Sequence, residues 1–448
     1  MKAASPLDNS ERVLLVGVAV KRAPRAGMIS TGAAGRESLV ELEELVHSAG
    51  AKVVGSRLQM RDTLDSATLV GSGMLAELKQ DAERLDAGLI ILDRNLSPVQ
   101  HRNIERGTDC RVIDRTQLIL DIFARHAHSR EGQLQVELAQ LNYLLPRLAG
   151  SKRELSRLGG GIGTRGPGEQ KLETDRRRIR ERVGKIERSI ETVRRQRAWR
   201  RRARQAVPLG TVALVGYTNA GKSTLFNALT HADVFVSSKM FATLDPTIRS
   251  MRLPSRRRVL LSDTVGFIRD LPADLIAAFR ATLEEAQESA AIVQVTDISN
   301  PWHADQDAEV EKVLEYLGVA DRPRVRVFNK VDLLAPDEFE TLRKSHGRKF
   351  LQASKAFPGV FVSAHTGQGL DELGRIIDEI MPVDPIVARR LNVPLANGRE
   401  LAMIYACGRV LHSEVQDGHI CLDAELPESL AARLENFGEP SENQRPGM

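Results

Sequence analysis

The stretch TVALVGYTNAGKSTLFNAL constrains the fold of this chain more than any other part of its sequence. An apolar run from Thr211 to Val215 leads into the pattern G-x-x-x-x-G-K-S, which ends at Ser223, and a helical pattern follows. A strand, a glycine-rich loop and a helix in this order point backbone N–H groups and a helix N-terminus at one phosphate. The stretch therefore predicts a P-loop in a mainly parallel α/β domain.

Two side chains of this loop have distinct expected roles. Lys222 is expected to bridge the β- and γ-phosphates, and the Ser223 hydroxyl is expected to ligate Mg²⁺. The backbone of the loop is expected to surround the β-phosphate. The predicted phosphate-binding residues are Gly216, Tyr217, Thr218, Asn219, Ala220, Gly221, Lys222 and Ser223.

Two later segments carry the residues of a phosphate-sensing switch. VLLSDTVGF ends an apolar strand at Asp263, which is expected to hold Mg²⁺ through a water, and the Gly266 N–H is expected to bond the γ-phosphate. FATLDPT offers Thr243 and Thr247 to complete the Mg²⁺ shell, and Thr243 is preferred because F-x-T-L is similar to switch I of GTPases. We predict Lys222, Thr243 and Gly266 as catalytic residues. The nucleotide contacts predicted here are Phe241, Ala242, Thr243, Leu244, Asp245, Asp263, Thr264, Val265 and Gly266.

The nucleotide base is predicted from VRVFNKVDLL and VFVSAHTGQGLDEL. Asp332 is placed to accept from N1–H and the 2-amino group of guanine, a pair of donors that adenine lacks. Asn329 is expected to steady the loop, and the Lys330 stem to lie over the ring. A serine hydroxyl and a backbone N–H farther along suit guanine O6. The base-binding residues of the predicted GTP site are Asn329, Lys330, Val331, Asp332, Ser363 and Ala364.

The residue after D-x-x-G departs from GTPases of the Ras type. Those proteins carry a glutamine there, which orients the attacking water. This chain has Phe267, followed by Ile268, and neither side chain can orient a water. We therefore expect slow intrinsic hydrolysis, with a bound partner or a repositioned switch supplying the missing stabilisation.

A basic helical hairpin is predicted before the P-loop. Residues 151–205 hold 19 Lys and Arg against 7 Asp and Glu, a net charge of +12, whereas the rest of the chain nets −7. This imbalance favours an RNA contact over an ordinary solvated face. The hairpin is predicted from two helical stripes of apolar residues: Leu134, Leu138, Leu141, Leu145 and Leu148, then Ile179, Val183, Ile186, Ile190 and Val193.

The connector of this hairpin, GGGIGTRGPGEQ, contains G-x-G-x-x-G at Gly161, Gly163 and Gly166. A dinucleotide loop must follow a strand, and the preceding SKRELSRL has a helical pattern instead. A disordered linker is the plain alternative. A loop with so few side chains can also approach another surface closely, and its arginine-rich neighbourhood favours this reading.

The rest of the chain completes a multidomain α/β protein. Residues 1–125 alternate strand and helix patterns, as in a small α/β domain. The domains that we expect next are the antiparallel hairpin at 126–206 with its tip at 149–170, the P-loop GTPase domain at 207–384, and a small α+β domain with a disordered tail at 385–448. Residues 93–105 are polar and follow a strand, a place where ligands often bind in α/β folds, and Ser97 and Pro98 equally suit the first turn of a helix. WHADQD is expected to form a loop.

The location of the protein is predicted from what its sequence lacks. No long uncharged apolar run and no secretory signal occurs, which argues against membrane insertion. Three widely spaced cysteines indicate reduced thiols. We therefore expect a cytoplasmic protein.

The assembled motifs resemble the HflX GTPases over essentially the whole chain. The resemblance rests on DRNLSPVQHRNIE, GGGIGTRGPGEQKLETDRRRIR, GYTNAGKSTLFN, FATLDPT, DTVGFIRDLPADLIAAFRATLEEA and NKVDLL. It implies a ribosome-stimulated GTPase that binds the large ribosomal subunit and splits stalled or idle ribosomes. The motifs predict Mg²⁺ as its cofactor, and we expect a monomer when the protein is free. By this resemblance the hairpin contacts 23S rRNA, through residues Gly159, Gly160, Gly161, Arg165, Arg176, Arg177 and Arg178.

Two alternatives share the same residues. A GTP-dependent assembly factor would bind an immature large subunit and never split a mature ribosome. An RNA-binding scaffold would use GTP only to stabilise its fold, although complete Mg²⁺ and guanine motifs argue against it. An ATP-dependent activity has been suggested for members of this family, but the N-terminal region contains no second P-loop and predicts none.

Overall fold

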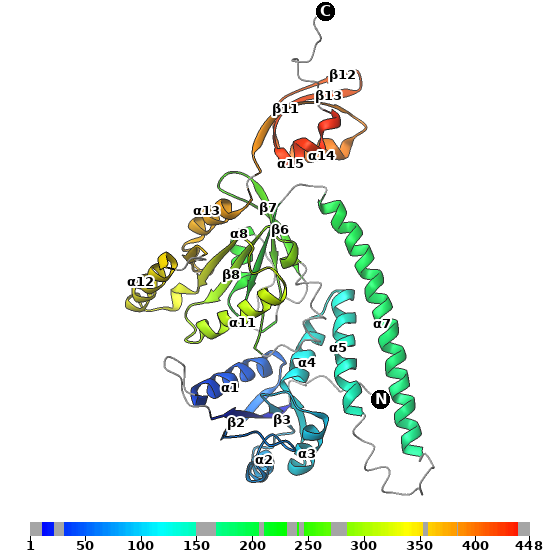
Figure 1. Cartoon of the computed structure of the whole chain (residues 1–448), viewed down its shortest axis with the longest axis vertical. Coiled ribbons are helices and arrows are strands. Elements are labelled where there is room, and N and C mark those ends of the chain that lie inside the picture. Colours follow the sequence, from blue (N-terminus) through cyan, green and yellow to red (C-terminus); the bar gives the residue numbers. More distant parts are fainter. Residues whose placement is uncertain are drawn as a thin grey trace, which may run out of the picture. The chain divides into compact units, whose positions relative to one another are not determined.

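The computed structural model describes residues 11–21, 31–148, 167–205, 210–230, 240–241, 246–269, 285–352, 357–382 and 384–437. They belong to two compact units. The first contains the described residues up to Val193 together with 240–241 and 265–269, and the second contains the others. Figure 1 shows the elements of each unit.

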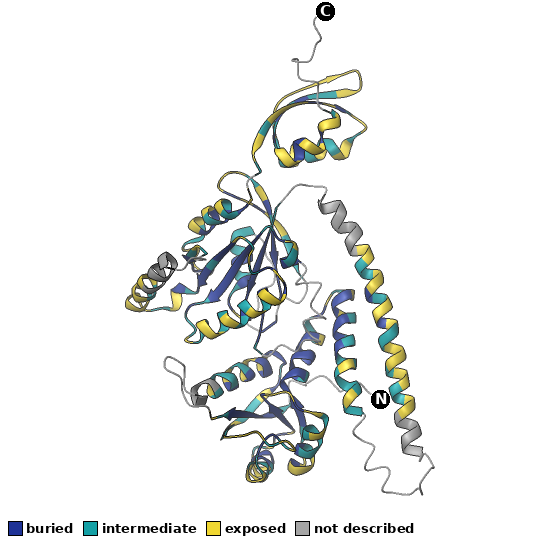
Figure 2. Ribbon diagram, viewed as in Figure 1, coloured by how far each residue is buried: buried dark blue, intermediate teal, exposed yellow. Residues whose placement is uncertain are grey.

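The first unit is built on a four-stranded parallel sheet. Its strands are β1 (Arg12–Val20), β2 (Lys52–Arg61), β3 (Leu89–Leu92) and β4 (Arg111–Asp114), in the order β2-β1-β3-β4. The apolar runs of β1 and β3 are buried because helices cover a parallel sheet, as Figure 2 shows. The helices are α1 (Thr31–Ser48), α2 (Ser72–Arg84), α3 (Pro98–Thr108) and α4 (Arg115–His126).

Helix α3 begins where its sequence predicts. Ser97 is its N-cap and forms a capping box with Gln100, and Pro98 occupies the first turn. Proline is favoured there because its missing N–H has no partner within a helix. The polar stretch after β3 is therefore accounted for by a helix start.

The predicted helical hairpin is present as α5 (Arg130–Leu148) and α7 (Pro167–Gln205), which run antiparallel in Figure 1. Glu137 and Arg182 join them, with Nε–Oε1 at 2.7 Å and Nη2–Oε2 at 2.9 Å. In α7, Ile186 and Ile190 are buried, as the stripe predicts. In α5 the most buried apolar side chains are Val136 and Ala139, whereas the predicted leucine stripe is half-buried.

The second unit contains a six-stranded sheet in the order β10-β9-β8-β5-β7-β6. All neighbouring strands are parallel except β6 and β7. Its strands are β5 (Thr211–Gly216), β6 (Thr247–Arg252), β7 (Arg258–Asp263), β8 (Ala291–Asp297), β9 (Arg324–Asn329) and β10 (Gly359–Phe361). Its helices are α8 (Lys222–Thr230), α11 (His303–Tyr316), η3 (Val331–Leu333), α12 (Pro336–Gln352) and α13 (Leu370–Ile380).

One expectation for this part of the chain differs from the structure. WHADQD does not form a loop, because α11 begins at His303 directly after Trp302. The last region combines strands and helices, as the sequence predicts. It contains an antiparallel sheet of order β11-β13-β12, formed by β11 (Ile386–Pro394), β12 (Arg409–Gln416) and β13 (His419–Pro427), with α14 (Gly398–Cys407), α15 (Glu428–Arg433) and η4 (Glu435–Phe437).

Among the helices of the described residues, none is both long enough and apolar enough to cross a bilayer. All three cysteines are free thiols, as their spacing predicts.

Candidate GTP-binding site

The P-loop connects the central strand β5 to α8, and two of its positions leave no room for a side chain. A Cβ on Gly216, whose φ is +154°, would lie 2.2 Å from the Val295 carbonyl oxygen. One on Gly221, whose φ is +90°, would lie 2.2 Å from Asn329 Nδ2. Only glycine fits such positive φ values at these distances. The two glycines therefore close the loop tightly enough for its backbone to approach a ligand.

Lys222 begins α8 and is buried within the loop that precedes it. Its ammonium donates to the carbonyl oxygens of Gly216, at 3.2 Å, and Tyr217, at 2.8 Å. Burial lowers the pKa of Lys222 to about 8, and the charge of Asp263 opposes the shift. A negative charge beside Lys222 would favour the protonated form of this side chain.

Ser223 and Asp263 meet beside the loop. The Ser223 hydroxyl donates to Asp263 Oδ2 at 2.6 Å, and Asp263 is fully buried at the end of β7. Asp263 lies opposite Leu214 of β5 in the parallel pairing. The next residue, Thr264, fixes this strand end by donating its hydroxyl to the Leu214 carbonyl at 2.6 Å.

Asn329 links the three loops of the site. Its Nδ2 donates to the Ala220 carbonyl at 2.9 Å, and its Oδ1 accepts from the Ala364 N–H at 3.0 Å. Asn329 is 2 % exposed, so its amide bonds to these loops rather than to solvent. Ser363 is buried beside it, whereas Asp332 is exposed in η3.

Lys330 is held in place by a residue that the sequence analysis did not select. Its Nζ lies 2.7 Å from Asp297 Oδ2, and its backbone is left-handed, with φ of 66°. Asp297 ends β8 opposite Asn329 and accepts from the N–H and hydroxyl of Ser299. An acidic residue at the end of the strand before the N-K-x-D strand is the signal that could have identified it.

The expected switch residues fall partly outside the described residues, which exclude Ala242, Thr243, Leu244 and Asp245. Phe241 is buried in the first unit, where its ring lies edge-on to Phe123 with centroids 4.5 Å apart. Its neighbour Met240 donates its N–H to Ser48 Oγ at 2.8 Å. The segment containing Phe241 is therefore fixed by residues of α1 and α4.

The segment after β7 is fixed in the first unit as well. It contains Val265 and Gly266, and the two residues that follow, Phe267 and Ile268, are each 2 % exposed. Arg269 Nη2 lies 3.1 Å from Glu37 Oε1, which belongs to α1. Phe267 and Ile268 are thus buried as well as apolar, which agrees with the inference that neither orients a water.

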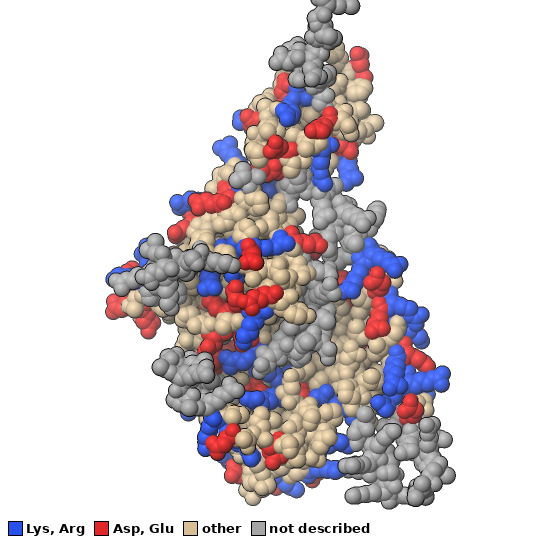
Figure 3. Space-filling model, in the orientation of Figure 1, with Lys and Arg blue, Asp and Glu red and all other residues tan. Residues whose placement is uncertain are grey.

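The RNA contacts predicted on the hairpin divide between two regions. Gly159, Gly160, Gly161 and Arg165 lie outside the described residues. Arg176, Arg177 and Arg178 lie on α7, where Figure 3 shows Lys and Arg interspersed with Asp and Glu. Arg177 pairs with Glu181 at 3.0 Å and Arg178 lies 4.0 Å from Asp175, in pairs that are mostly exposed. Such pairs contribute about 1 kcal/mol or less, so a phosphate can readily replace them.

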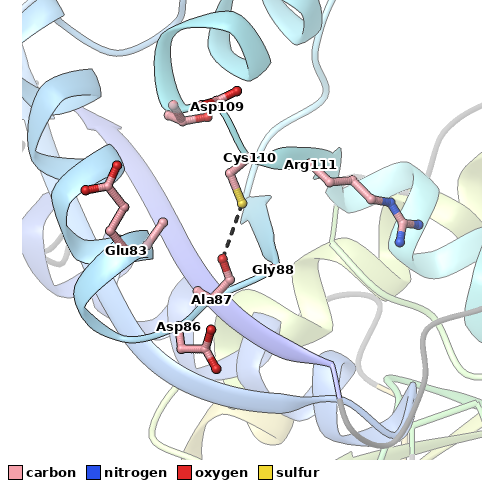
Figure 4. A pocket seen from close by; sticks show the side chains of 9 residues that line it. Glu83, Asp86, Ala87, Gly88, Asp109, Cys110 and Arg111 are labelled. Carbon is pink, nitrogen blue, oxygen red and sulfur yellow. Dashed lines mark hydrogen bonds between the residues drawn. The ribbon is translucent and has the colours of Figure 1, made fainter.

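A separate pocket lies in the first unit, at the amino ends of β3 and β4 (Figure 4). Its thiol, Cys110, donates to the Ala87 carbonyl at 3.5 Å. Burial raises the pKa of Cys110, which keeps the thiol protonated and unreactive at neutral pH. The pocket carries no chemistry that competes with the P-loop.

These features together define a class of protein. A P-loop between a central parallel strand and a helix, a buried aspartate at the end of the neighbouring strand, and an N-K-x-D loop tied to both are the parts of a P-loop GTPase.

Comparison with known proteins agrees and gives the family. Residues 36–124 match the family model described as GTP-binding GTPase N-terminal, residues 126–204 that of the GTP-binding GTPase Middle Region, and residues 211–330 that of the 50S ribosome-binding GTPase. The GTPase HflX of Caldanaerobacter subterraneus is 44% identical over 401 residues, covering 90% of each chain. That of Alkalihalophilus pseudofirmus is 50% identical over 322 residues, covering 72% of this chain and 74% of its own.

Among solved structures, the SsGBP and GDP complex is 24% identical, covers 83% of this chain and 98% of its own, and has a TM-score of 0.46. The curated relatives span nearly the whole chain at well above 30% identity. The chain therefore belongs to the HflX family of GTPases, and it is an enzyme that binds and hydrolyses GTP.

Proposed function

We propose that this GTPase binds the large ribosomal subunit, contacts 23S rRNA through the α5–α7 hairpin, and splits or recycles stalled and idle ribosomes. The observation that carries the proposal is the match of residues 211–330 to a family described as 50S ribosome-binding GTPases. The basic α7, which precedes that domain in the sequence, supports an RNA contact. Free cysteines suit a reducing cytoplasm, where we place the protein as a monomer when free.

We assign the phosphates of GTP to the P-loop and its guanine to the N-K-x-D loop. Lys222 binds the β- and γ-phosphates, and its lowered pKa is restored by their charge. Asp332 accepts from the guanine edge, while the Lys330 stem covers the ring with its ammonium held by Asp297. Asn329 keeps the phosphate and base loops at a fixed separation.

Mg²⁺ fits the oxygen atoms that the site presents. Ser223 Oγ, which is half-buried, and Asp263 Oδ2, which is fully buried, lie 2.6 Å apart beside the loop, and hydroxyl and carboxylate oxygens are the ligands this ion prefers. We assign Ser223 and Thr243 as direct ligands and Asp263 as a ligand through water. When bound, the ion neutralises negative charge on the β- and γ-oxygens.

Hydrolysis is proposed to depend on the ribosome. The chain has no glutamine after D-x-x-G, and the buried Phe267 and Ile268 leave the attacking water without a side chain to orient it. Gly266 contributes its N–H to the γ-phosphate, and the large subunit supplies or repositions the remaining group. GTP turnover then times release from the ribosome.

The proposal is tested by GTP hydrolysis with and without purified large subunits, at low and physiological salt. Three proteins are compared: the wild type, a variant with residues 159–168 replaced by a short Gly-Ser loop, and Lys222→Ala as the turnover-deficient control. We expect strong stimulation of the wild type, weakened by salt because phosphate contacts release counterions. The loop variant should bind GTP normally and lose most of the stimulation.

The mature 70S ribosome and a precursor of the large subunit are then offered in competition. Splitting requires that the 70S particle dissociates in a GTP-dependent way, which sucrose-gradient sedimentation measures directly. A preference for the precursor with no dissociation of 70S would replace splitting by an assembly role. Unstimulated hydrolysis with every particle would overturn the ribosomal proposal.

A further inference from the structure

A second group of arginines lies on the GTPase domain, in the hairpin formed by β6 and β7. Residues 246–262 contain five arginines and no acidic residue. Strand β6 is the edge strand of the six-stranded sheet, and all of its residues except Met251 are half-buried or exposed. The five residues are Arg249, Arg252, Arg256, Arg257 and Arg258. We call them the arginine hairpin.

One arginine of the hairpin is used internally and holds the turn rigid. Arg257 Nη2 lies 2.6 Å from Asp378 Oδ1 and donates to the Asp378 carbonyl at 2.8 Å. The same carboxylate accepts from the N–H and the hydroxyl of Ser255, each at 2.8 Å. The turn is therefore fixed on α13, and its other arginines project from a rigid base.

The remaining four arginines are exposed, and within the described residues none of them forms an ion pair. Arg249 donates to its neighbour's carbonyl, and Arg258 makes a long 3.4 Å contact with the Ala406 carbonyl. Arg252 and Arg256 have no side-chain hydrogen bond in this part of the chain. These guanidinium groups keep nearly all of their donors available.

Two of the arginines face each other across the hairpin. Arg252 of β6 is the direct partner of Arg258 in β7. Like charges at directly opposite positions of an antiparallel pair destabilise the sheet. The arrangement becomes favourable when anions lie between or above the two groups, because the planar guanidinium binds a phosphate with two parallel hydrogen bonds.

We propose that the arginine hairpin is a second RNA-binding surface, which grips the phosphate backbone of ribosomal RNA independently of the α5–α7 hairpin. This inference rests on the proposed ribosomal function, because it takes its partner from there. Several arginines on one rigid edge, without base-reading amides or aromatics among them, suit a charged backbone more than a base sequence. The surface therefore positions the GTPase domain on RNA.

The test compares the full-length wild type with Arg252→Gln/Arg256→Gln. The matched control is Arg343→Gln/Arg375→Gln, which removes two exposed arginines from α12 and α13. Binding to purified large subunits is measured with a non-hydrolysable GTP analogue over a range of salt. We expect Arg252→Gln/Arg256→Gln, called the hairpin variant below, to bind several-fold more weakly and to lower the slope of log Kd against log salt by about one to two. The control should have the Kd and the salt slope of the wild type.

Two further measurements separate binding from stability. The Tm of the nucleotide-free Arg252→Gln protein should not fall, because the substitution removes a repulsion. Arg252→Lys/Arg256→Lys keeps the charge and should retain the salt slope. A hairpin variant with wild-type Kd and slope overturns the proposal, as does a loss of binding accompanied by a lowered Tm in Arg252→Gln.

Failure of the inference can be told apart from failure of the proposed function. If the hairpin variant binds normally while the Gly-Ser loop variant does not, only the second surface is wrong. If the wild type does not bind large subunits, a fluorescein-labelled RNA duplex is the probe. Weaker binding of this duplex by the hairpin variant than by the control supports the RNA surface without the ribosome, and equal binding overturns it.

Discussion

Lys222, the sequence neighbour of Ser223, and Asp263, its hydrogen-bond partner, are a buried cation and a buried anion, and each is costly to bury without a partner. The lysine is satisfied by two carbonyl oxygens, which are weaker partners for an ammonium than a carboxylate or a phosphate. A site that holds a cation with neutral acceptors keeps its strongest interaction for the ligand.

The affinity for GTP should therefore fall as Lys222 loses its proton. The free protein has a pKa of about 8 at this residue, and binding of the triphosphate requires the protonated form. Kd for a fluorescent GTP analogue should rise about sevenfold between about pH 7 and pH 8.8, as proton linkage demands. Lys222→Arg, which stays charged, is the control, and a flat profile in the wild type would contradict the assignment.

The lowered pKa of Lys222 makes the stability of the nucleotide-free protein depend on pH in the opposite direction to its affinity for GTP. Because the pKa of Lys222 is lower in the folded protein than its ordinary value of 10.5, the unfolded chain binds more protons between about pH 8 and 10.5. The nucleotide-free protein should gain stability over that window as pH rises, while it loses affinity for GTP.

Asp332 is expected to set base specificity, since it is an exposed carboxylate in η3 next to the anchored Asn329 and Lys330. Asp332→Asn places an amide donor where guanine also donates. GTP binding should weaken roughly 100-fold, because two hydrogen bonds to a charged acceptor are lost, and xanthosine triphosphate should become the better ligand. Competition titration of the two nucleotides measures this, and an unchanged preference for GTP would remove Asp332 from the site.

Among the elements, the α5–α7 hairpin shows which buried residues a periodic sequence pattern predicts and which it does not. The spacing of Ile186 and Ile190 predicts burial, and both are buried. The leucines of α5 are only half-buried, whereas Val136 and Ala139 of the same helix are buried, and α5 contacts α4 as well as α7. One helix with two partners cannot be described by one stripe.

Packing at Ile186 should contribute more to the hairpin than any of its surface charges. Ile186→Ala removes a fully buried side chain and should lower the free energy of unfolding of this unit by about 3 kcal/mol. Glu137→Gln breaks the exposed pair with Arg182 and should cost less than about 1 kcal/mol. Urea denaturation followed by circular dichroism compares them. Equal losses of unfolding free energy in the two variants would mean that burial of Ile186 does not hold α7 in place.

Across the fold, features formed by residues close in sequence can be predicted, and contacts between residues distant in sequence cannot. The P-loop, the D-x-x-G strand end and the N-K-x-D strand end are local patterns, and the structure places each at a strand end as expected. Contacts such as that of Phe241 with Phe123 join residues far apart in sequence, so no local pattern indicates them. WHADQD misleads because its helix starts at a tryptophan without a side-chain cap.

The position of Asn329 has a consequence for how the enzyme meets its nucleotide. One buried amide already holds the loop for the phosphates and the loop for the base in register. The conformational entropy of arranging these loops is therefore lost when the chain folds, and little remains to be lost when GTP arrives. When the phosphates of GTP bind to their loop, the loop for the guanine is already in its binding position, so binding of the second group requires little further ordering of the protein.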